Sequence, residues 1–305
     1  MDVVTGSFGY IGKYITKELL DRGREVKTIT THPDKPNPFG SKVKASSYDF
    51  DNPDKLTRYL EGCETLYNTY WIRFNYRQWS FEKAIENTKV LFNCAKKAGV
   101  KKIIHISVTN VSLNDKLPYY HGKALQEEAL KNLGIEYTIV RPTLVFGIED
   151  ILVNNIAWTI RKFPVVPIFG SGKYKVQPIF IEDLAKIAVE APRLNGSQII
   201  DAIGPETYTY AEFLKLISRE LNRNIAYLHT PPSLGIFLGK IIGLFVRDVV
   251  LTKDELSGLM LSKLTSDQTP NGNTLFSQWL QKNKNQIGIG YTSELNRHFR
   301  WEKGV

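Results

Sequence analysis

The sequence predicts an α/β fold: a Rossmann-like, doubly wound parallel sheet with helices on both faces, followed by a smaller, mostly helical C-terminal region. Two observations lead to this prediction. Short apolar runs rich in β-branched residues alternate with helical patterns along the first half of the chain, as in parallel sheets. At the N-terminus, a strand-like run is followed at once by glycines at three-residue spacing and then by a helical pattern.

The first strand, turn and helix are expected within residues 2–23. Gly6 allows a tight turn, Gly9 lets a pyrophosphate approach the amides at the helix N-terminus, and Gly12 lets helix and strand lie close together. A preceding strand and a following helix are the context that supports this motif. We therefore expect a dinucleotide to contact Gly6, Ser7, Phe8, Gly9, Tyr10, Ile11 and Gly12.

The end of the second expected strand, residues 25–31, bears on the choice between NAD and NADP. A carboxylate at this place bonds the 2′-hydroxyl of the adenosine ribose and repels a 2′-phosphate. Here the chain has Thr30, Thr31 and His32, and Lys35 follows. Hydroxyls and a nearby cation tolerate a phosphate, so NADP is the expected cofactor and NAD the alternative.

Strands and helices continue to alternate beyond this point. Further strands are expected at 42–50, 64–70, 101–107 and 136–140. Helices are expected between them at 54–62, 81–99 and 124–134. A parallel sheet of this kind binds its ligands at the carboxyl ends of the strands.

The alternation loosens after about Glu149. We therefore expect an NAD(P)-binding domain over residues 1–150 and a smaller substrate-side region over 151–305. A Pro- and Gly-rich stretch, another helix and a short strand follow the boundary. This order predicts that the second region is interleaved with the last strands of the sheet, at about 176–204.

The composition narrows the functional classes. The chain has 305 residues, 42% of them hydrophobic, and a formal charge of +9. Because the lysines are dispersed, we expect no nucleic-acid partner. Cys63, Cys94 and the scattered histidines lack metal-like spacing, so no metal is expected, and so few cysteines suit a reducing, cytoplasmic location. The glycine motif begins almost at Met1, so no leader is expected.

A tyrosine and a lysine four residues apart stand at the start of an expected helix, in the sequence YYHGK. At this spacing Tyr119 and Lys123 share one helix face. An ammonium beside a phenol lowers the pKa of the phenol, so the pair can exchange a proton with a substrate. The alternative is an aromatic ring resting on a lysine stem. Tyr120, three residues from Lys123, is a competing phenol.

These motifs resemble the short-chain dehydrogenase/reductase superfamily, in its extended or atypical branch, and the group related to the accessory NAD(P)-binding subunit of respiratory complex I. TGSFGYIG is similar to the TGxxGxxG cofactor turn, and YYHGK matches YxxxK. YDFDNPDKL, IIHISVTN, VRPTLVFG and VQPIFIEDLA resemble further landmarks of the extended branch. The resemblance covers roughly the first two thirds of the chain and specifies no substrate.

The resemblance implies roles for individual residues. Tyr119 is the implied proton donor or acceptor, and Lys123 the implied anchor of the nicotinamide ribose. Ser107 is a third catalytic candidate. Asp49 and Phe50 are implied to meet adenine. The remaining expected cofactor contacts are Asn68, Thr69, Tyr70, Ser107, Pro142 and Thr143.

Two features depart from the family's pattern. The Ser or Thr that usually polarises a substrate carbonyl stands one residue after the position of Ser107, where this chain has Val108. Ser107 and Thr109 are displaced candidates for that role. The connection from Ser107 to Tyr119 is also short for the extended branch. Both features weigh against ordinary carbonyl chemistry and leave cofactor binding largely untouched.

The stretch NTYWIRFNYRQW follows the fourth expected strand, at the expected mouth of the cofactor site. It gathers aromatic residues around Arg73 and Arg77. One interpretation is an aromatic lid whose arginines hold an anionic group, and the other is a loop packed on the core with its arginines in solvent. Other, weaker substrate-side candidates are Trp71, Thr109, Asn154, Asn155, Trp158 and Gln177.

Residues 233–252, SLGIFLGKIIGLFVRDVVLT, form a separate apolar segment. Gly235, Gly239 and Gly243 recur every fourth residue and give one helix face a smooth groove. The apolar run is interrupted by Lys240 and is too short to span a bilayer. We expect this helix to pack within the protein or a dimer; contact with a partner helix or a membrane surface is the alternative.

Two functions remain open at this point. The first is an NAD(P)-dependent oxidoreductase or epimerase acting on a small carbonyl or alcohol. The second is a non-catalytic NAD(P)-binding module that acts as a redox sensor or as an assembly or accessory subunit. The Tyr119–Lys123 pair favours the first, whereas Val108 and the helical C-terminal region favour the second.

Overall fold

The computed structural model describes residues 1–300, and these divide into two compact units. The first unit contains residues 1–141 and 184–201, and the second contains 142–183 and 202–300. The chain first passes from the first unit to the second after Arg141, close to the end of a strand. Residues 184–201 return to the first unit, where they supply most of a helix and an edge strand.

The first unit is built on a seven-stranded sheet with the order β11-β6-β5-β4-β1-β2-β3. Its strands are β1 (Asp2–Thr5), β2 (Val26–Thr30), β3 (Val43–Ser47), β4 (Thr65–Asn68), β5 (Lys102–Ile106), β6 (Glu136–Pro142) and β11 (Gln198–Ala202). The five pairings from β6 across to β3 are parallel. The strand order reverses between β1 and β4, and such a switch point is where doubly wound sheets bind ligands.

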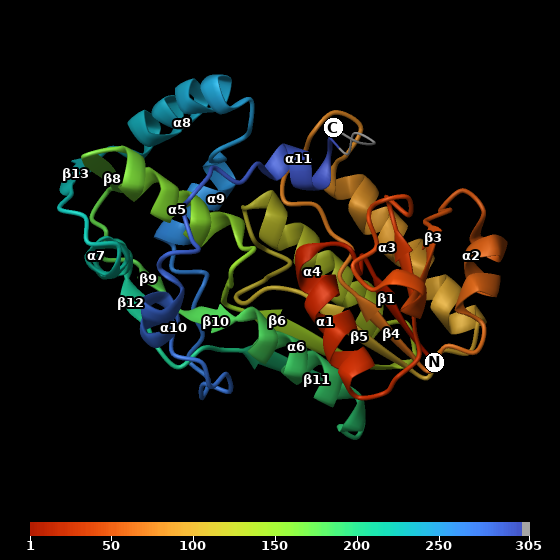
Figure 1. The fold of residues 1–305 in the computed structure, drawn as a ribbon. Helices are drawn as coiled ribbons and strands as arrows, with labels where there is room; N and C mark the ends of the chain where they lie inside the picture. The colour runs from red at the N-terminus through yellow and green to blue at the C-terminus, as the bar shows by residue number, and fades with distance from the viewer. Residues whose placement is uncertain (301–305) are drawn as a thin grey trace. The chain divides into compact units, whose positions relative to one another are not determined.

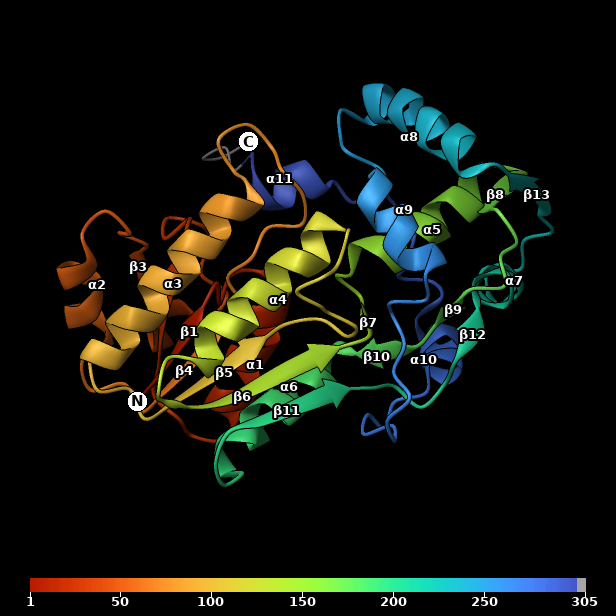
Figure 2. The same cartoon turned by 180° about the vertical axis from the view of Figure 1, so that it is seen from behind.

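Helices cover both faces of this sheet, so the predicted fold class is confirmed (Figures 1 and 2). One face carries α1 (Tyr10–Asp21) and α6 (Ile181–Glu190), and the other carries α2 (Pro53–Leu60), α3 (Phe81–Lys97) and α4 (Pro118–Lys131). An ion pair between Arg22 and Glu190 joins the ends of α1 and α6. Because both faces are covered, the central strands are continuous apolar runs, with Val3, Ile29 and Ile103 fully buried.

The second unit combines short strands with helices. Its strands are β7 (Leu144–Phe146), β8 (Val165–Phe169), β9 (Lys175–Val176), β10 (Pro178–Phe180), β12 (Tyr208–Thr209) and β13 (Ala226–Thr230). They form three two-stranded sheets, β10-β7, β12-β9 and β13-β8. Its helices are α5 (Ile151–Lys162), α7 (Tyr210–Glu220), α8 (Pro232–Val246), α9 (Lys253–Met260), α10 (Phe276–Asn283) and α11 (Glu294–His298). Phe146, Phe213 and Phe276 lie at the centre of its core.

Two single 3-10 turns of the first unit, Gly40–Lys42 and Ala191–Arg193, complete the described elements of the chain.

Residues 1–300 contain neither a membrane-spanning helix nor a cluster of metal ligands. No helix in this range is long and apolar enough to cross a bilayer. In the same range, no three His, Cys, Asp or Glu side chains come together in the way that would hold a metal ion.

Candidate functional site

The turn between β1 and α1 has the geometry that a pyrophosphate group requires. Gly6 has a φ of +68°, in the left-handed region. A Cβ on Gly12 would lie 2.3 Å from the Gly6 carbonyl oxygen, so only glycine fits there. Gly9 is the N-cap of α1, and no side chain in the described part of the chain caps the helix at this end. The helix therefore directs backbone amides and its positive dipole end outward, which favours phosphate.

The other residues of this turn differ in exposure. Ser7 is fully buried; its Oγ accepts a hydrogen bond from Thr16 Oγ1 at 2.7 Å, and its N–H donates to Thr28 Oγ1 at 3.1 Å. Ser7 thus ties α1 to β2, and its hydroxyl is engaged inside the protein. Phe8 is buried as well, whereas Tyr10 and Ile11 are partly exposed on the first turn of α1.

A buried hydrogen-bond network joins the carboxyl ends of β1, β4 and β5. Thr5 Oγ1 donates to Asn68 Oδ1 at 3.2 Å and accepts from the Thr69 N–H at 2.7 Å. Asn68 Nδ2 lies 3.0 Å from His105 Nδ1. Burial lowers the pKa of His105 well below its ordinary value, so its ring is neutral and Nδ1 accepts from the amide. The network fixes the sheet edge at the switch point, and the side chain of Asn68 is used within it.

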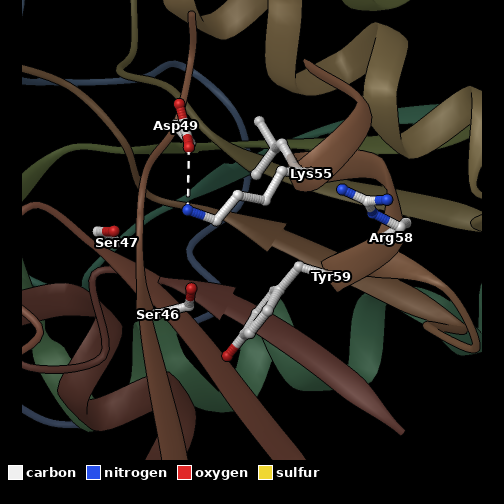
Figure 3. Close-up of a pocket in the computed structure, with 7 residues that line it drawn as sticks. Ser46, Ser47, Asp49, Lys55, Arg58 and Tyr59 are labelled. Atoms are coloured by element: carbon white, nitrogen blue, oxygen red, sulfur yellow. Dashed lines mark hydrogen bonds and ion pairs between the residues drawn. The ribbon is translucent and has the colours of Figure 1, made fainter. Parts of the chain in front are cut away.

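The ends of β2 and β3 lie side by side, because Thr30 pairs with Ser47. Thr30 is buried, Thr31 is exposed and His32 is partly exposed. Figure 3 shows a pocket between β3 and α2, in which Asp49 accepts a hydrogen bond from Lys55 Nζ at 3.1 Å. The pocket is lined by Ser46, Ser47, Asp49, Lys55, Leu56, Arg58 and Tyr59.

Three aromatic rings form a wall in the same region of the first unit. Tyr48 and Phe50 are stacked with their ring centroids 4.9 Å apart, and Tyr70 contacts both rings at 4.9 and 5.4 Å. The Tyr70 hydroxyl accepts a hydrogen bond from Asn87 at 2.9 Å. Burial raises the pKa of both Tyr48 and Tyr70, so these rings are neutral contact surfaces.

Aromatic side chains of the loop that follows β4 pack onto the first unit. Trp71 stacks on Phe81 with centroids 5.4 Å apart, and Phe74 is buried. Arg73 is partly exposed. Arg77 is exposed, and its guanidinium lies 5.4 Å from the ring of its neighbour Tyr76.

Lys123 lies inside the first unit with only 4% of its surface exposed. Its Nζ donates a hydrogen bond to the Ile106 carbonyl at 2.9 Å and lies 4.9 Å from the centroid of the Trp71 ring. Burial lowers the pKa of Lys123 to about 7, and the charge of Glu127 opposes this shift. The amine can therefore gain or lose its proton near neutral pH.

The two tyrosines at the start of α4 differ in burial. Tyr119 is partly exposed, whereas Tyr120 is 5% exposed. The ring of Tyr119 meets Trp71 edge-on at 5.9 Å, so Trp71 contacts both Tyr119 and Lys123. This difference in burial favours Tyr119 as the phenol that a ligand could reach.

Glu127 and Arg141, which the sequence did not single out, form a buried polar group with Ser107. Ser107 Oγ donates to Glu127 Oε1 at 2.6 Å. Arg141 donates to both carboxylate oxygens of Glu127, at 2.8 and 2.5 Å, and this contact raises the pKa of the guanidinium. The available signal was the four-residue spacing of Tyr119, Lys123 and Glu127, which puts a carboxylate on the same helix face.

Residues 107–109, at the end of β5, are all buried. Val108 is 6% exposed and has no polar group, and Thr109 is fully buried. All three of these side chains are therefore largely shielded from solvent in the chain.

The remaining candidates belong to the second unit. Pro142 and Thr143 are its first residues, and Thr143 Oγ1 donates to a backbone carbonyl at 3.3 Å. Asn154, Asn155 and Gln177 each bond to backbone groups of that unit through both ends of their amides. These bonds satisfy the amides internally. Trp158 packs its ring edge-on against Phe163 and Tyr291.

Residues 6–147 match the NAD(P)H-binding family. The chain is 24% identical over 239 residues to NADH dehydrogenase (ubiquinone) 1 alpha subcomplex subunit 9 of Arabidopsis thaliana, and this match covers 75% of the chain and 60% of the plant protein. It is 25% identical over 249 residues to the photosystem II assembly factor Ycf39 of Guillardia theta, covering 80% of the chain and 77% of that protein. The fold is similar to the NADPH-dependent quinone oxidoreductase of Escherichia coli in complex with NADPH, with a TM-score of 0.74 and 19% identity over 92% of the chain and 99% of that structure.

Fold, glycine turn and sequence matches together define a dinucleotide-binding protein of the Rossmann-like class. Residues 6–147 form its NAD(P)H-binding domain.

Proposed function

We propose that this protein binds NAD(P)(H) as an accessory or assembly module and does not turn over a carbonyl substrate. The observation that carries the proposal is the hydrogen bond from Ser107 to Glu127, together with the apolar Val108 beside it. Carbonyl reduction in this superfamily uses a hydroxyl donor at that place, and here the hydroxyl of Ser107 is directed to a buried carboxylate. Two of the relatives, named as a subunit and as an assembly factor, suggest the same kind of role.

The residues of the first unit fit a dinucleotide. We assign the pyrophosphate to Gly9 and the N-terminus of α1, where backbone amides are directed outward. Gly9 has no side chain to obstruct the pyrophosphate, and a Cβ at this position would lie 3.2 Å from the Gly6 carbonyl oxygen. The ring wall of Tyr48, Phe50 and Tyr70 supplies an apolar surface for adenine. In this proposal, Lys123 is the residue whose amine donates to the hydroxyls of the nicotinamide ribose.

The proposed cofactor preference is NADP over NAD. Thr30 and Thr31 end β2 without a carboxylate, and the adjoining pocket beside β3 is lined by Lys55 and Arg58. Asp49, the carboxylate of that pocket, is already paired with Lys55. A 2′-phosphate at the ends of β2 and β3 would contact hydroxyls and cations, and the pairing of Asp49 with Lys55 would limit repulsion by that carboxylate. A reducing compartment is part of the same proposal, since Cys63 and Cys94 are buried free thiols.

The proposal is tested by comparing binding with turnover. Isothermal titration should show NADPH binding to the wild-type protein. Under NADPH saturation, absorbance at the nicotinamide band should then show no oxidation above the buffer rate with a panel of quinones, aldehydes and ketones. Binding together with substrate-dependent NADPH consumption would contradict the proposal.

The Tyr119–Lys123 pair favours a second candidate, an NAD(P)-dependent reductase. Tyr119 and Lys123 share a helix face, the pKa of Lys123 is lowered to about 7, and Tyr119 is the accessible phenol. When bound, the cofactor supplies a hydride; Tyr119 would then supply the proton. For this candidate, Tyr119→Phe should abolish turnover at unchanged NADPH affinity, while Tyr120→Phe, in the neighbouring buried ring, should keep it.

A further inference from the structure

The helix α8 of the second unit is apolar almost throughout. Between Pro232 and Val246 the only polar side chains are Ser233 and Lys240. Figure 1 shows α8 beside β8 and β13, as the pale blue helix of the second unit. A helix that is apolar on every side is normally buried within a core or a membrane.

The face of α8 that meets the protein is its narrow glycine face. Gly235, Gly239 and Gly243 are buried. A Cβ on Gly235 would lie 2.2 Å from the ring of Phe169, and one on Gly243 would lie 2.6 Å from the Asp248 carbonyl oxygen. The close approach predicted from the glycine spacing therefore occurs, and it occurs within the second unit.

Six large side chains of α8 lie on the opposite face and are exposed, so this face does not pack within the chain itself. Leu244 is 80% exposed and Phe245 is 84% exposed. The outward face, which we call the α8 apolar face, consists of Leu234, Phe237, Leu238, Ile241, Leu244 and Phe245, each at least 36% exposed. Their spacing of three and four residues places them on one side of the helix. An exposed, contiguous apolar face of this kind marks an interaction site.

The segment of the chain that contains α8 carries charges of one sign only. Residues 221–247 contain no Asp or Glu, and they contain the cations Arg223, Lys240 and Arg247. Ser233 and Lys240 are seven residues, or about two helical turns, apart. Both polar side chains therefore lie on the same edge of the α8 apolar face. A lysine at the edge of an apolar face can keep its stem along hydrocarbon and its amine among headgroups. The first carboxylate beyond, Asp248, is buried and accepts hydrogen bonds from Tyr291 and from the N–H of Glu294.

We infer that the α8 apolar face docks on the surface of an anionic lipid bilayer. Leu, Ile and Phe with flanking cations are the composition of an interfacial helix, whereas protein hot spots favour Trp, Tyr and Arg, which this face lacks. The helix has 15 residues, about 22 Å in length, so it lies along the interface and does not cross the hydrocarbon core of about 30 Å. The inference concerns the second unit and is independent of dinucleotide binding.

Vesicle flotation of the full chain tests this inference. One set of vesicles contains phosphatidylcholine with 30% phosphatidylglycerol, and a second set contains phosphatidylcholine alone. The double variant Leu244→Ser/Phe245→Ser removes the two most exposed apolar side chains of the face. Leu261→Ser/Ile289→Ser is the matched control, because those side chains are 64% and 73% exposed outside α8. An unchanged melting temperature in each variant verifies folding.

The wild-type protein and the control should float with anionic vesicles and bind phosphatidylcholine at least tenfold more weakly. Leu244→Ser/Phe245→Ser should lose at least tenfold in affinity for anionic vesicles. Lys240→Glu should weaken binding at low salt, and this loss should shrink in 0.5 M NaCl, where surface charges are screened. Absence of wild-type flotation, or equal flotation of the α8 double variant, would overturn the inference. A wild-type dimer that becomes a monomer in the α8 variant would instead assign the face to a second copy of the chain.

Discussion

The hydroxyl of Ser107 donates a hydrogen bond of 2.6 Å to the carboxylate of Glu127, which lies one helix turn beyond Lys123 on α4. Glu127 is 1% exposed and is also held by Arg141. Hydrogen bonds to a buried carboxylate are charge-assisted and short, so the hydroxyl is strongly held. To polarise a substrate carbonyl, Ser107 would first have to break this bond. This bond is the basis of the proposal that the protein binds the cofactor without reducing a carbonyl substrate.

Glu127→Gln should destabilise the protein. The substitution removes a buried negative charge and leaves the Arg141 guanidinium without its ion-pair partner, a change that typically costs about 3 kcal/mol. The free energy of unfolding in urea measures this cost. Glu128→Gln, one residue along the same helix and with 43% of its side chain exposed, should change it by less than about 0.5 kcal/mol. Equal effects of the two substitutions would remove the structural role assigned to Glu127.

Thr31→Asp should shift the cofactor preference from NADP to NAD. Thr31 is exposed at the end of β2, so the new carboxylate remains in solvent. A carboxylate at position 30 would instead be buried, because Thr30 is buried. Repulsion of the 2′-phosphate should weaken NADPH binding about tenfold, or about 1.4 kcal/mol, and leave NADH binding within about threefold. Thr31→Asn, similar in shape and uncharged, is the control for titration. Tighter binding of NADH than NADPH by the wild type would contradict the proposed preference.

The wild-type stability should rise with pH above neutrality through Lys123. Its pKa is lowered from 10.5 in the unfolded chain to about 7 in the folded protein, chiefly by burial. Below about pH 7 the amine is charged in both states and the full penalty of burial applies. Between about 7 and 10.5 the unfolded state binds one more proton, so the free energy of unfolding increases by about 1.4 kcal/mol per pH unit.

Lys123→Met removes this contribution. Urea denaturation at pH 7, 8 and 9 should show the free energy of unfolding of the wild type rising relative to that of Lys123→Met, by up to about 1.4 kcal/mol per pH unit. Lys89→Met, at an exposed position on α3, should follow the wild type. Parallel pH profiles for wild type and Lys123→Met would show that the buried amine keeps its ordinary pKa.

The sheet was predictable from sequence because its signals are local. The β-branched run before Gly6, the glycine spacing and the four-residue apolar period after Gly9 each depend on neighbours in the chain. The NAD(P)-binding domain that they predicted is confirmed by the fold and by the family match. The start of α4 at Pro118, with Tyr119 and Lys123 one turn apart, follows from the same short-range information.

Long-range contacts were not predictable in this way. Ser107, Glu127 and Arg141 come from β5, α4 and β6, and only the folded sheet brings them together. Asn154 looked available for a ligand in the sequence, yet its amide bonds to the backbone of Gly288, 134 residues away. In α8 the glycine spacing predicted a contact face correctly. It carried no information on the opposite face, because exposure depends on what the rest of the chain leaves uncovered.

Isothermal titration of NADPH into the wild type and two glycine variants tests dinucleotide binding at the turn between β1 and α1. Gly9→Val places a side chain where the pyrophosphate approaches the N-terminus of α1, 3.2 Å from the Gly6 carbonyl oxygen. Gly290→Val is the matched control, because no atom lies within 4 Å of the Cβ that it adds. When circular dichroism shows all three proteins to be folded, we expect the wild type and Gly290→Val to bind NADPH and Gly9→Val to lose at least a hundredfold in affinity. NADPH affinity unchanged in Gly9→Val would contradict the assignment of this turn as the dinucleotide site.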